Sequence, residues 1–323
     1  MARNLFTNAR VVTPSEVFLG TVEVYAERIV RVDLGATSLP GAEDFGGDYL
    51  LPGLVDLDAG HLTLPALHDE DLIATDLAAA SSGCTTAFSS LTVHATDVPA
   101  AAPGLARIVD RIAEWRQRGT VRCDHFFRLI VADDCPPDAA AEVLLRLGTA
   151  LARLVSVPAP WVDAGRRDVA ARLTEWRDAG ATVGKTGHDP AEAGTSARSP
   201  FGTGRDRFPS GAHADAPLVP LFGPHDALPA PAGVSPAGPG RTGCLVSAGA
   251  PVELLRSVFR HHDRDGWPLP AAVTLATATP AGIAGLTDRG RVEVGLRADF
   301  VRVRREGPLA VPIATWRAGQ RFS

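Results

Sequence analysis

The sequence predicts an α/β protein: a distorted TIM-type barrel with a small β-sandwich formed by both termini. Two patterns support this prediction. Between residues 50 and 286, strand-like apolar runs alternate with amphipathic helix-like segments, as in a parallel sheet covered by helices. Residues 1–49 and 287–323 instead alternate apolar and polar residues in short runs, which is typical of antiparallel strands with one wet face.

The first barrel strand is expected at residues 51–57, where an apolar run begins around Pro52-Gly53. A run that is apolar on both faces suits a strand inside a parallel sheet. Polar side chains gather where this strand ends, at Asp56, Asp58 and His61. Because barrel enzymes carry their sites at the carboxyl ends of strands, we expect the site here.

The remaining barrel elements follow from periodicity and glycine or proline boundaries. Strands are expected at residues 85–93, 125–133, 152–160, 181–189, 218–226 and 243–251. Helices are expected at residues 69–83, 99–118, 136–152, 166–180, 251–262 and 269–285. Residues 190–216 lack apolar periodicity and are expected to form a long irregular loop, so the barrel has about seven recognisable strands.

Composition narrows the class of protein. The chain has 323 residues and a net charge of −5, which argues against a nucleic-acid surface. No apolar run reaches the roughly 18 residues of a membrane span, and the first residues lack a signal-peptide pattern, so we expect a cytoplasmic protein with no membrane partner. The four cysteines form no metal-binding pair.

Three segments resemble the amidohydrolase superfamily, and within it the phosphonate-metabolism branch. They are the run LLPGLVDLDAGHL at residues 50–62, the helix expected at residues 269–285, and GLRADF at residues 295–300. The resemblance implies a barrel with a β-sandwich from both ends of the chain. It also implies a metal-dependent hydrolase site, in which His and carboxylate ligands hold a divalent ion that activates water.

Most ligand positions that the resemblance implies are changed in this chain. Asp58 and Gly60 stand at the two first-strand positions, and Arg128 and Ala132 at those of the third strand. Ala159-Pro160 and Ser247-Ala248-Gly249 occupy two further positions, and only His188-Asp189 matches. We therefore expect no bound metal and no other cofactor.

Arg128 is the most informative of these changes. Side chains alternate along a strand, so a residue that replaces an inward ligand also points inward. A buried carboxylate without a metal ion is costly, and a guanidinium can supply the missing positive charge. We expect Arg128 to form an ion pair with Asp58, within about 4 Å.

The candidate catalytic residues are Asp58, Arg128 and His188, with Arg128 also able to hold an anionic substrate. Candidate substrate-binding residues at the strand ends are His61, Lys185 and His225. Each has a structural alternative: a carboxylate at a barrel end, an ion-pair arginine, or a histidine bonded to the backbone.

The first functional hypothesis is a divergent amidohydrolase-superfamily protein with metal-independent chemistry on a small, anionic molecule at the barrel mouth. An alternative is a non-catalytic pseudoenzyme that acts as a scaffold or regulatory partner. Another is a metal-dependent hydrolase of C–N or phosphoanhydride bonds with relocated ligands. The sequence leaves open whether the chain forms a homo-oligomer or binds a different protein.

Overall fold

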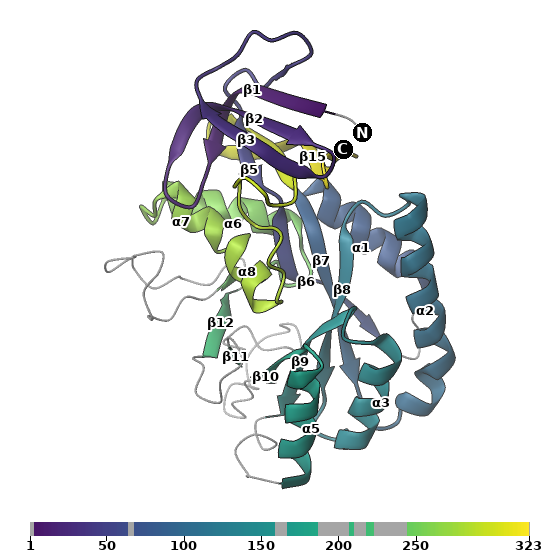
Figure 1. Cartoon of the computed structure of the whole chain (residues 1–323). Helices are drawn as coiled ribbons and strands as arrows, with labels where there is room; N and C mark the ends of the chain where they lie inside the picture. Colours follow the sequence, from purple (N-terminus) through teal and green to yellow (C-terminus); the bar gives the residue numbers. More distant parts are fainter. Residues whose placement is uncertain are drawn as a thin grey trace.

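The computed structural model describes residues 3–63, 68–158, 167–186, 207–209, 218–222 and 244–322. A sheet built from both ends of the chain lies against one end of a second, mostly parallel sheet, which carries helices on its outer side (Figure 1). The fold is therefore the predicted distorted TIM-type barrel with a terminal β-sandwich.

The terminal sheet joins the two ends of the chain, in the order β16-β15-β14-β5-β1-β2-β3, with β4 paired to β1. Its strands are β1 (Arg3–Val12), β2 (Val17–Tyr25), β3 (Arg28–Leu34), β4 (Glu43–Asp44), β5 (Tyr49–Pro52), β14 (Phe300–Glu306), β15 (Leu309–Arg317) and β16 (Gln320–Arg321). The sheet curls so that the start of β3 meets the segment before β14, where Ile29 N donates to Leu296 O at 2.9 Å.

Aromatic side chains fill the space inside the curled sheet. The Phe6 ring meets Phe45, Phe300 and Trp316 edge-on, with ring centroids 5.6, 5.9 and 5.1 Å apart. All four rings are buried. Because Phe6 and Trp316 come from opposite ends of the chain, this core holds the two termini together.

The strand expected at residues 51–57 is two strands in different sheets, which corrects the prediction. β5 ends at Pro52 in the terminal sheet, and β6 (Leu54–Thr63) begins the barrel. Gly53 lies between them and donates its N–H to Asp299 O at 2.9 Å. A Cβ atom at Gly53 would lie 2.4 Å from the Thr85 side chain, so only glycine fits this passage.

The barrel sheet contains all seven predicted strands and one more. Its strands are β6, β7 (Cys84–Val93), β8 (Asp124–Val131), β9 (Ala152–Pro158), β10 (Thr182–Thr186), β11 (Arg207–Pro209), β12 (Leu218–Phe222) and β13 (Cys244–Leu245). Neighbours are parallel except around β11, which runs antiparallel to both β10 and β12. The expectation that residues 190–216 are wholly irregular was therefore wrong at β11, whose three residues were too few to show periodicity.

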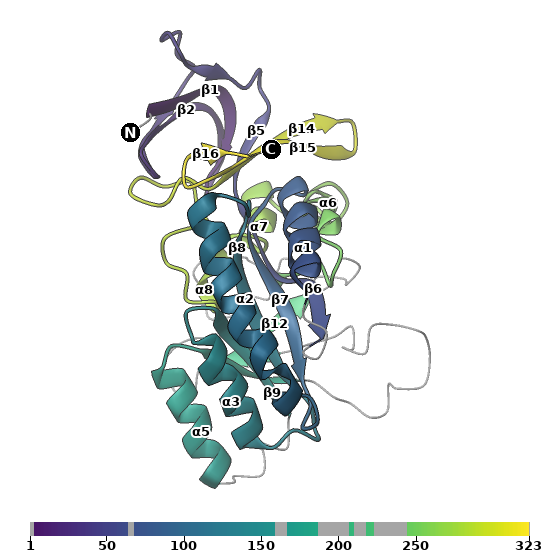
Figure 2. The same ribbon diagram turned by 90° about the vertical axis from the view of Figure 1, so that its right-hand side faces the viewer.

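Helices cover the outside of the barrel. They are α1 (Asp69–Ser81), α2 (Val98–Arg118), α3 (Pro137–Leu147), α5 (Arg167–Asp178), α6 (Val252–Asp263), α7 (Leu269–Thr274) and α8 (Ala278–Ile283). The side view shows α2, α3 and α5 on one flank and α1 and α6 under the terminal sheet (Figure 2). The helix expected at residues 269–285 is broken into α7 and α8, because the backbone of Thr277, with a φ of −136° and a ψ of −85°, is not helical.

Residues after β13 close the barrel against β6. Gly249 N donates to Asp58 O at 2.8 Å, and Val55 N donates to Ala276 O at 2.9 Å. The two outer strands of the sheet order are thereby brought together. In the described part of the chain, no helix is both long and apolar enough to cross a membrane.

A buried cluster of charges connects the barrel to the terminal sheet at the amino end of β8. The Asp124 carboxylate lies 2.6 Å from Arg289 Nη1, 2.6 Å from Arg297 Nη1 and 3.4 Å from Arg317 Nη1. Burial alone would raise the pKa of Asp124, but the charges of these arginines hold this pKa well below its usual range. One carboxylate thus connects β8 with two segments near the C-terminus.

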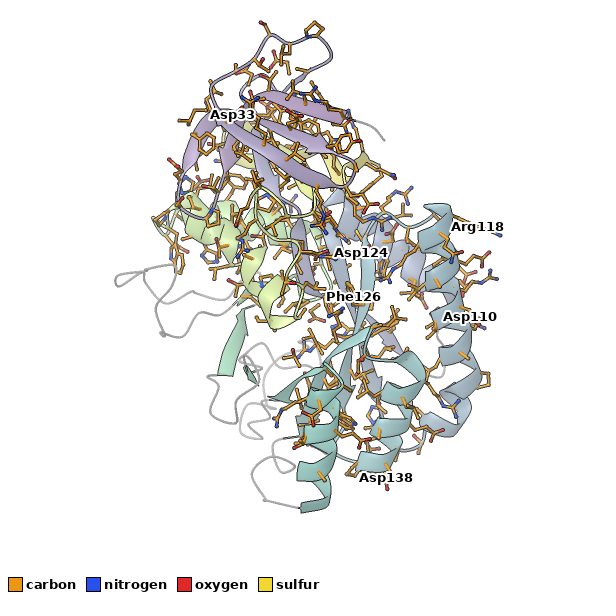
Figure 3. All side chains as sticks on the ribbon, in the orientation of Figure 1. Asp33, Asp110, Arg118, Asp124, Phe126 and Asp138 are labelled. Atoms are coloured by element: carbon orange, nitrogen blue, oxygen red, sulfur yellow. The ribbon has the colours of Figure 1, made fainter. Side chains whose placement is uncertain are left out.

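The substitution Asp124→Asn should destabilise the protein by about 3 to 5 kcal/mol, because three guanidinium groups lose their shared counter-charge. Asp110→Asn on the exposed side of α2 is the matched control and should change stability by less than about 0.5 kcal/mol. Both positions are labelled in Figure 3. Urea denaturation above pH 5 would measure the difference, and equal midpoints for the two variants would contradict the structural role of Asp124.

Candidate functional site

The candidate site lies at the carboxyl end of the barrel strands, as predicted. In the sheet register His61 of β6 is opposite Ser90 of β7, and Ser90 is opposite Arg128 of β8. The turn after β13 reaches the same place through Ser247. The parallel register and this turn therefore bring together residues that are up to 189 positions apart in the sequence.

Asp58 is the centre of this group. Its Oδ1 accepts a hydrogen bond from Ser90 Oγ at 2.7 Å and lies 3.6 Å from His61 Nε2. The Asp58 side chain is 10% exposed, whereas that of His61 is 32% exposed. The carboxylate is thus fixed from inside the barrel, while the imidazole can meet a molecule at the mouth.

A second carboxylate, Asp56, lies beneath Asp58 and is completely buried. Its Oδ1 accepts hydrogen bonds from the backbone N–H groups of Asp58 and Ser247, both at 3.1 Å. Its Oδ2 has no hydrogen-bond partner among the described residues. Burial raises the pKa of Asp56 to about 6, against the opposing hydrogen bonds from Ser247 and Asp58. The Asp58 charge contributes to this raised pKa.

The turn that follows β13 has an unusual backbone. Ala248 has a φ of 53° and Gly249 a φ of 81°. Both lie in the left-handed region, which residues other than glycine rarely adopt. Ser247 Oγ donates to Asp58 O at 3.0 Å, and Gly249 N donates to the same oxygen at 2.8 Å. The strained turn, which costs on the order of 1 kcal/mol, is therefore held by its contacts with the Asp58 backbone.

Arg128 points into the barrel but does not pair with Asp58, so the expected ion pair was wrong. Within the described part of the chain, Asp58 contacts Ser90 and His61, and Arg128 Nε donates to Ser156 Oγ at 3.3 Å. The physical reason is the sheet order: β7 separates β6 from β8, and strands are about 4.8 Å apart. Ser90 fills the space that a direct contact would need.

Three predicted site residues are not tested by these contacts. His188 and His225 lie outside the described residues. Lys185 belongs to β10, where its backbone pairs with Val157 and Arg207, and its side chain is not described. Their roles stay predictions.

The divalent ion that the resemblance implies would need three or more nitrogen, oxygen or sulfur ligands. Among the described residues, no group of three His, Cys, Asp or Glu side chains is arranged to hold one. Asp56, Asp58 and His61 are the candidate ligands at the mouth. However, Asp58 Oδ1 accepts a hydrogen bond from Ser90, and Asp56 Oδ2 is buried. These residues do not complete a metal site by themselves.

Three serine hydroxyl groups belong to the site without having been predicted from the sequence. Ser90, Ser156 and Ser247 are buried and contact Asp58 or Arg128. Serine is common on surfaces and in loops, so its presence in a strand carries little signal. Only the alternation along β7, which puts Ser90 on the same face as Phe88, could have indicated an inward hydroxyl.

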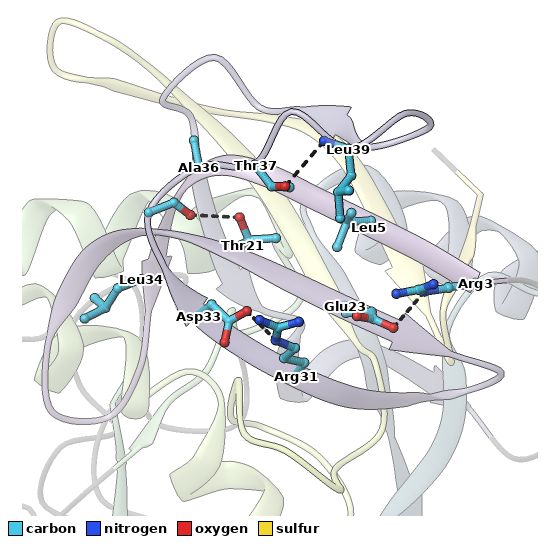
Figure 4. Close-up of a pocket in the computed structure, with 11 residues that line it drawn as sticks. Arg3, Leu5, Thr21, Glu23, Arg31, Asp33, Leu34, Ala36, Thr37 and Leu39 are labelled. Atoms are coloured by element: carbon cyan, nitrogen blue, oxygen red, sulfur yellow. Dashed lines mark hydrogen bonds and ion pairs between the residues drawn. The ribbon is translucent and has the colours of Figure 1, made fainter.

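A pocket on the terminal sheet is not the candidate site. It lies between β2, β3 and residues 34–39 (Figure 4). Its charged side chains are already paired, Arg3 with Glu23 at 2.8 Å and Arg31 with Asp33 at 2.5 Å. Such exposed ion pairs contribute little to the free energy of folding. None of the residues that line this pocket is a buried titratable group.

Comparison with known proteins gives one named relative by sequence. Alpha-D-ribose 1-methylphosphonate 5-triphosphate diphosphatase of Escherichia coli (strain K12) is 24% identical over 391 aligned positions. The alignment covers 98% of this chain and 99% of that protein. No family model matches the chain.

Several solved structures share the fold along the whole chain. N-acetylglucosamine-6-phosphate deacetylase from Pasteurella multocida has a TM-score of 0.67 at 16% identity, covering 100% of both chains. The Mycobacterium smegmatis deacetylase has a TM-score of 0.66 at 18% identity, covering 99% of this chain and 100% of that one. Enamidase, a member of the amidohydrolase superfamily, has a TM-score of 0.58 at 15% identity, covering 99% and 95%. The predicted resemblance to the amidohydrolase superfamily is therefore confirmed as a likeness in fold over the whole chain.

Proposed function

We propose that this protein binds a small phosphate-bearing anion at the barrel mouth and acts on it by acid–base chemistry that does not depend on the superfamily's metal cage. The observation that carries the proposal is the Asp58–His61 couple, with Asp58 Oδ1 3.6 Å from His61 Nε2. An anchored carboxylate beside a partly exposed imidazole is an arrangement that orients and charges a general acid or base.

The hydrogen bond from Ser90 supports this assignment. It holds one oxygen of Asp58 at 2.7 Å, so the carboxylate cannot rotate freely away from His61. His61 would then exchange a proton with the substrate, and Asp58 would stabilise the imidazolium form without touching the substrate. This makes His61 a catalytic residue in the proposal, where the sequence suggested substrate binding.

The expected substrate class rests on charge and on the named relatives. Arg128 is buried inside the barrel, opposite Ser90 in the sheet register. Its guanidinium can hold an anionic group. The named relatives are a triphosphate diphosphatase and 6-phosphate deacetylases, and both names describe phosphate-bearing molecules. His188 and Lys185 are the further residues that we assign to this anion, from the sequence prediction.

Two other functions are outcomes of the same tests. A scaffold or regulatory partner would bind no small anion at the mouth and would associate stably with another protein. A metallo-hydrolase with relocated ligands, which would include Asp58, His61, His188 and His225, would be purified with its metal ion.

The variant His61→Gln should abolish the turnover found with phosphorylated sugars, or reduce it at least tenfold, because the exposed partner of Asp58 is lost. His94→Gln is the matched control: His94 is also an exposed histidine near a carboxylate, 3.1 Å from Asp134, and it should leave the response unchanged. A screen of phosphorylated sugars by thermal shift, followed by phosphate and product assays, would supply the measurement. No response from the natural sequence across the screen would count against the proposal.

Protein purified without added metal should contain well below one equivalent of zinc, manganese or iron, since the described donors do not complete a metal site. Elemental analysis by mass spectrometry would measure the content. A stoichiometric metal ion that is retained after dialysis and lost in Asp58→Asn would establish the metallo-hydrolase instead.

Asp56 predicts a pH dependence of stability. Its folded pKa of about 6 is above its unfolded value, so the folded state holds a proton that the unfolded state loses first. Stability from this group is therefore present at low pH and lost as pH rises through about 4 to 6. From pH 4 to pH 7.5, Asp56→Asn should gain about 3 kcal/mol of unfolding free energy relative to the natural sequence. Denaturant curves that shift in parallel at both pH values would show that Asp56 is ionised in the fold.

A further inference from the structure

A second group of charges surrounds Phe126, at the amino ends of β8 and β9, opposite the barrel mouth. The guanidinium carbons of Arg116 and Arg153 lie 5.3 and 5.2 Å from the centre of the Phe126 ring. Arg116 comes from the last turn of α2, and Arg153 from the start of β9. Phe126 and the neighbouring Asp124 are labelled together in Figure 3, below the terminal sheet.

This region contains more arginines than carboxylates. Asp124 contacts three guanidinium groups, Asp288 pairs with Arg289, and Asp299 pairs with Arg297. Arg116 and Arg153 have no carboxylate within ion-pair distance among the described residues. Five arginines therefore face three carboxylates, and the excess positive charge falls on these two side chains.

The two arginines also have unused hydrogen-bond donors. Arg116 Nη2 donates to His125 O at 2.7 Å, and Arg153 Nη1 donates to Ala284 O at 3.4 Å. The Nε atom of each is buried and lacks a hydrogen-bond partner in the described part of the chain. Leaving a buried guanidinium donor unsatisfied is costly, and contact with one aromatic ring offsets only part of that cost.

The titration of both side chains agrees with this geometry. Burial lowers the pKa of Arg153, the nearby Arg289 charge lowers it further, and the Asp288 carboxylate opposes this only in part. Burial also lowers the pKa of Arg116; the Asp124 carboxylate opposes this, and the charges of Arg317, Arg289 and Arg297 add to it. A bound anion would relieve this repulsion.

We propose that a phosphate group binds to the guanidinium groups of Arg116 and Arg153 beside Phe126, in a site separate from the barrel mouth. Both arginines are only half-buried, so their remaining Nη groups can reach a small oxyanion from solvent. Guanidinium groups bind phosphate through paired, charge-assisted hydrogen bonds. The ligand is either free inorganic phosphate or the phosphate group of a small ester, since the chemistry of recognition is shared.

The test is the thermal shift caused by phosphate at constant ionic strength, with chloride as the reference ion. Saturating inorganic phosphate should raise the Tm of the natural sequence by about 3 °C, by mass action. Arg116→Gln and Arg153→Gln should each lose more than half of that shift. Arg146→Gln, which removes an exposed arginine paired with Glu142 on α3, is the matched control and should keep the whole shift.

Further variants distinguish this site from the barrel mouth and show whether a lost shift comes from misfolding. His61→Gln should keep the phosphate shift, because the mouth is not involved. Arg153→Lys, which keeps the charge and the fold, should retain part of the shift. In the His61→Gln variant, equal shifts with inorganic phosphate and ribose 5-phosphate would identify the free anion as sufficient, and a larger shift with the ester that Arg116→Gln removes would identify an ester site.

Three results would overturn the proposal. One is no phosphate shift in the natural sequence, and another is an undiminished shift in both glutamine variants. The third is an oligomer of the natural sequence that Arg116→Gln and Arg153→Gln convert to monomers in chloride, since a carboxylate of a second copy would then occupy the two arginines.

Discussion

The shared carboxylate of Asp124 is the constraint that organises this molecule. Asp124 is the first residue of β8, and its carboxylate contacts Arg289, Arg297 and Arg317. These arginines lie on the segments that lead into and form the terminal sheet. A single buried anion among three cations is stable only while all of them are present. The terminal sheet is thereby fixed to the amino end of the barrel, which leaves the carboxyl end open for chemistry.

The two ends of the barrel consequently differ in charge. Among the described residues, the amino end carries an excess of arginine around Phe126, whereas the mouth carries Asp56 and Asp58 together with Arg128. At the mouth, Ser90 and the turn at Ser247 take up the hydrogen-bonding capacity that a metal ion would otherwise satisfy in part. Hydroxyl groups and backbone N–H groups thus hold the carboxylates of the barrel mouth in place.

Part of the site could be predicted from residues close together in sequence. Asp58 and His61 are three positions apart at the end of an apolar strand, and the structure brings them within 3.6 Å. That Arg128 points inward followed from strand alternation alone. Its partner did not, because the predicted pair with Asp58 ignored the intervening strand β7, where Ser90 stands between them.

The sequence by itself determined the α/β class and the position of most elements, because apolar periodicity and turn residues are local properties of the chain. Only the tertiary structure decided that Pro52 and Leu54 belong to different sheets, that β11 runs antiparallel, and which groups contact Asp58 and Asp124. Those outcomes depend on strand order and register between distant segments, and a change of register by one residue turns every side chain to the other face.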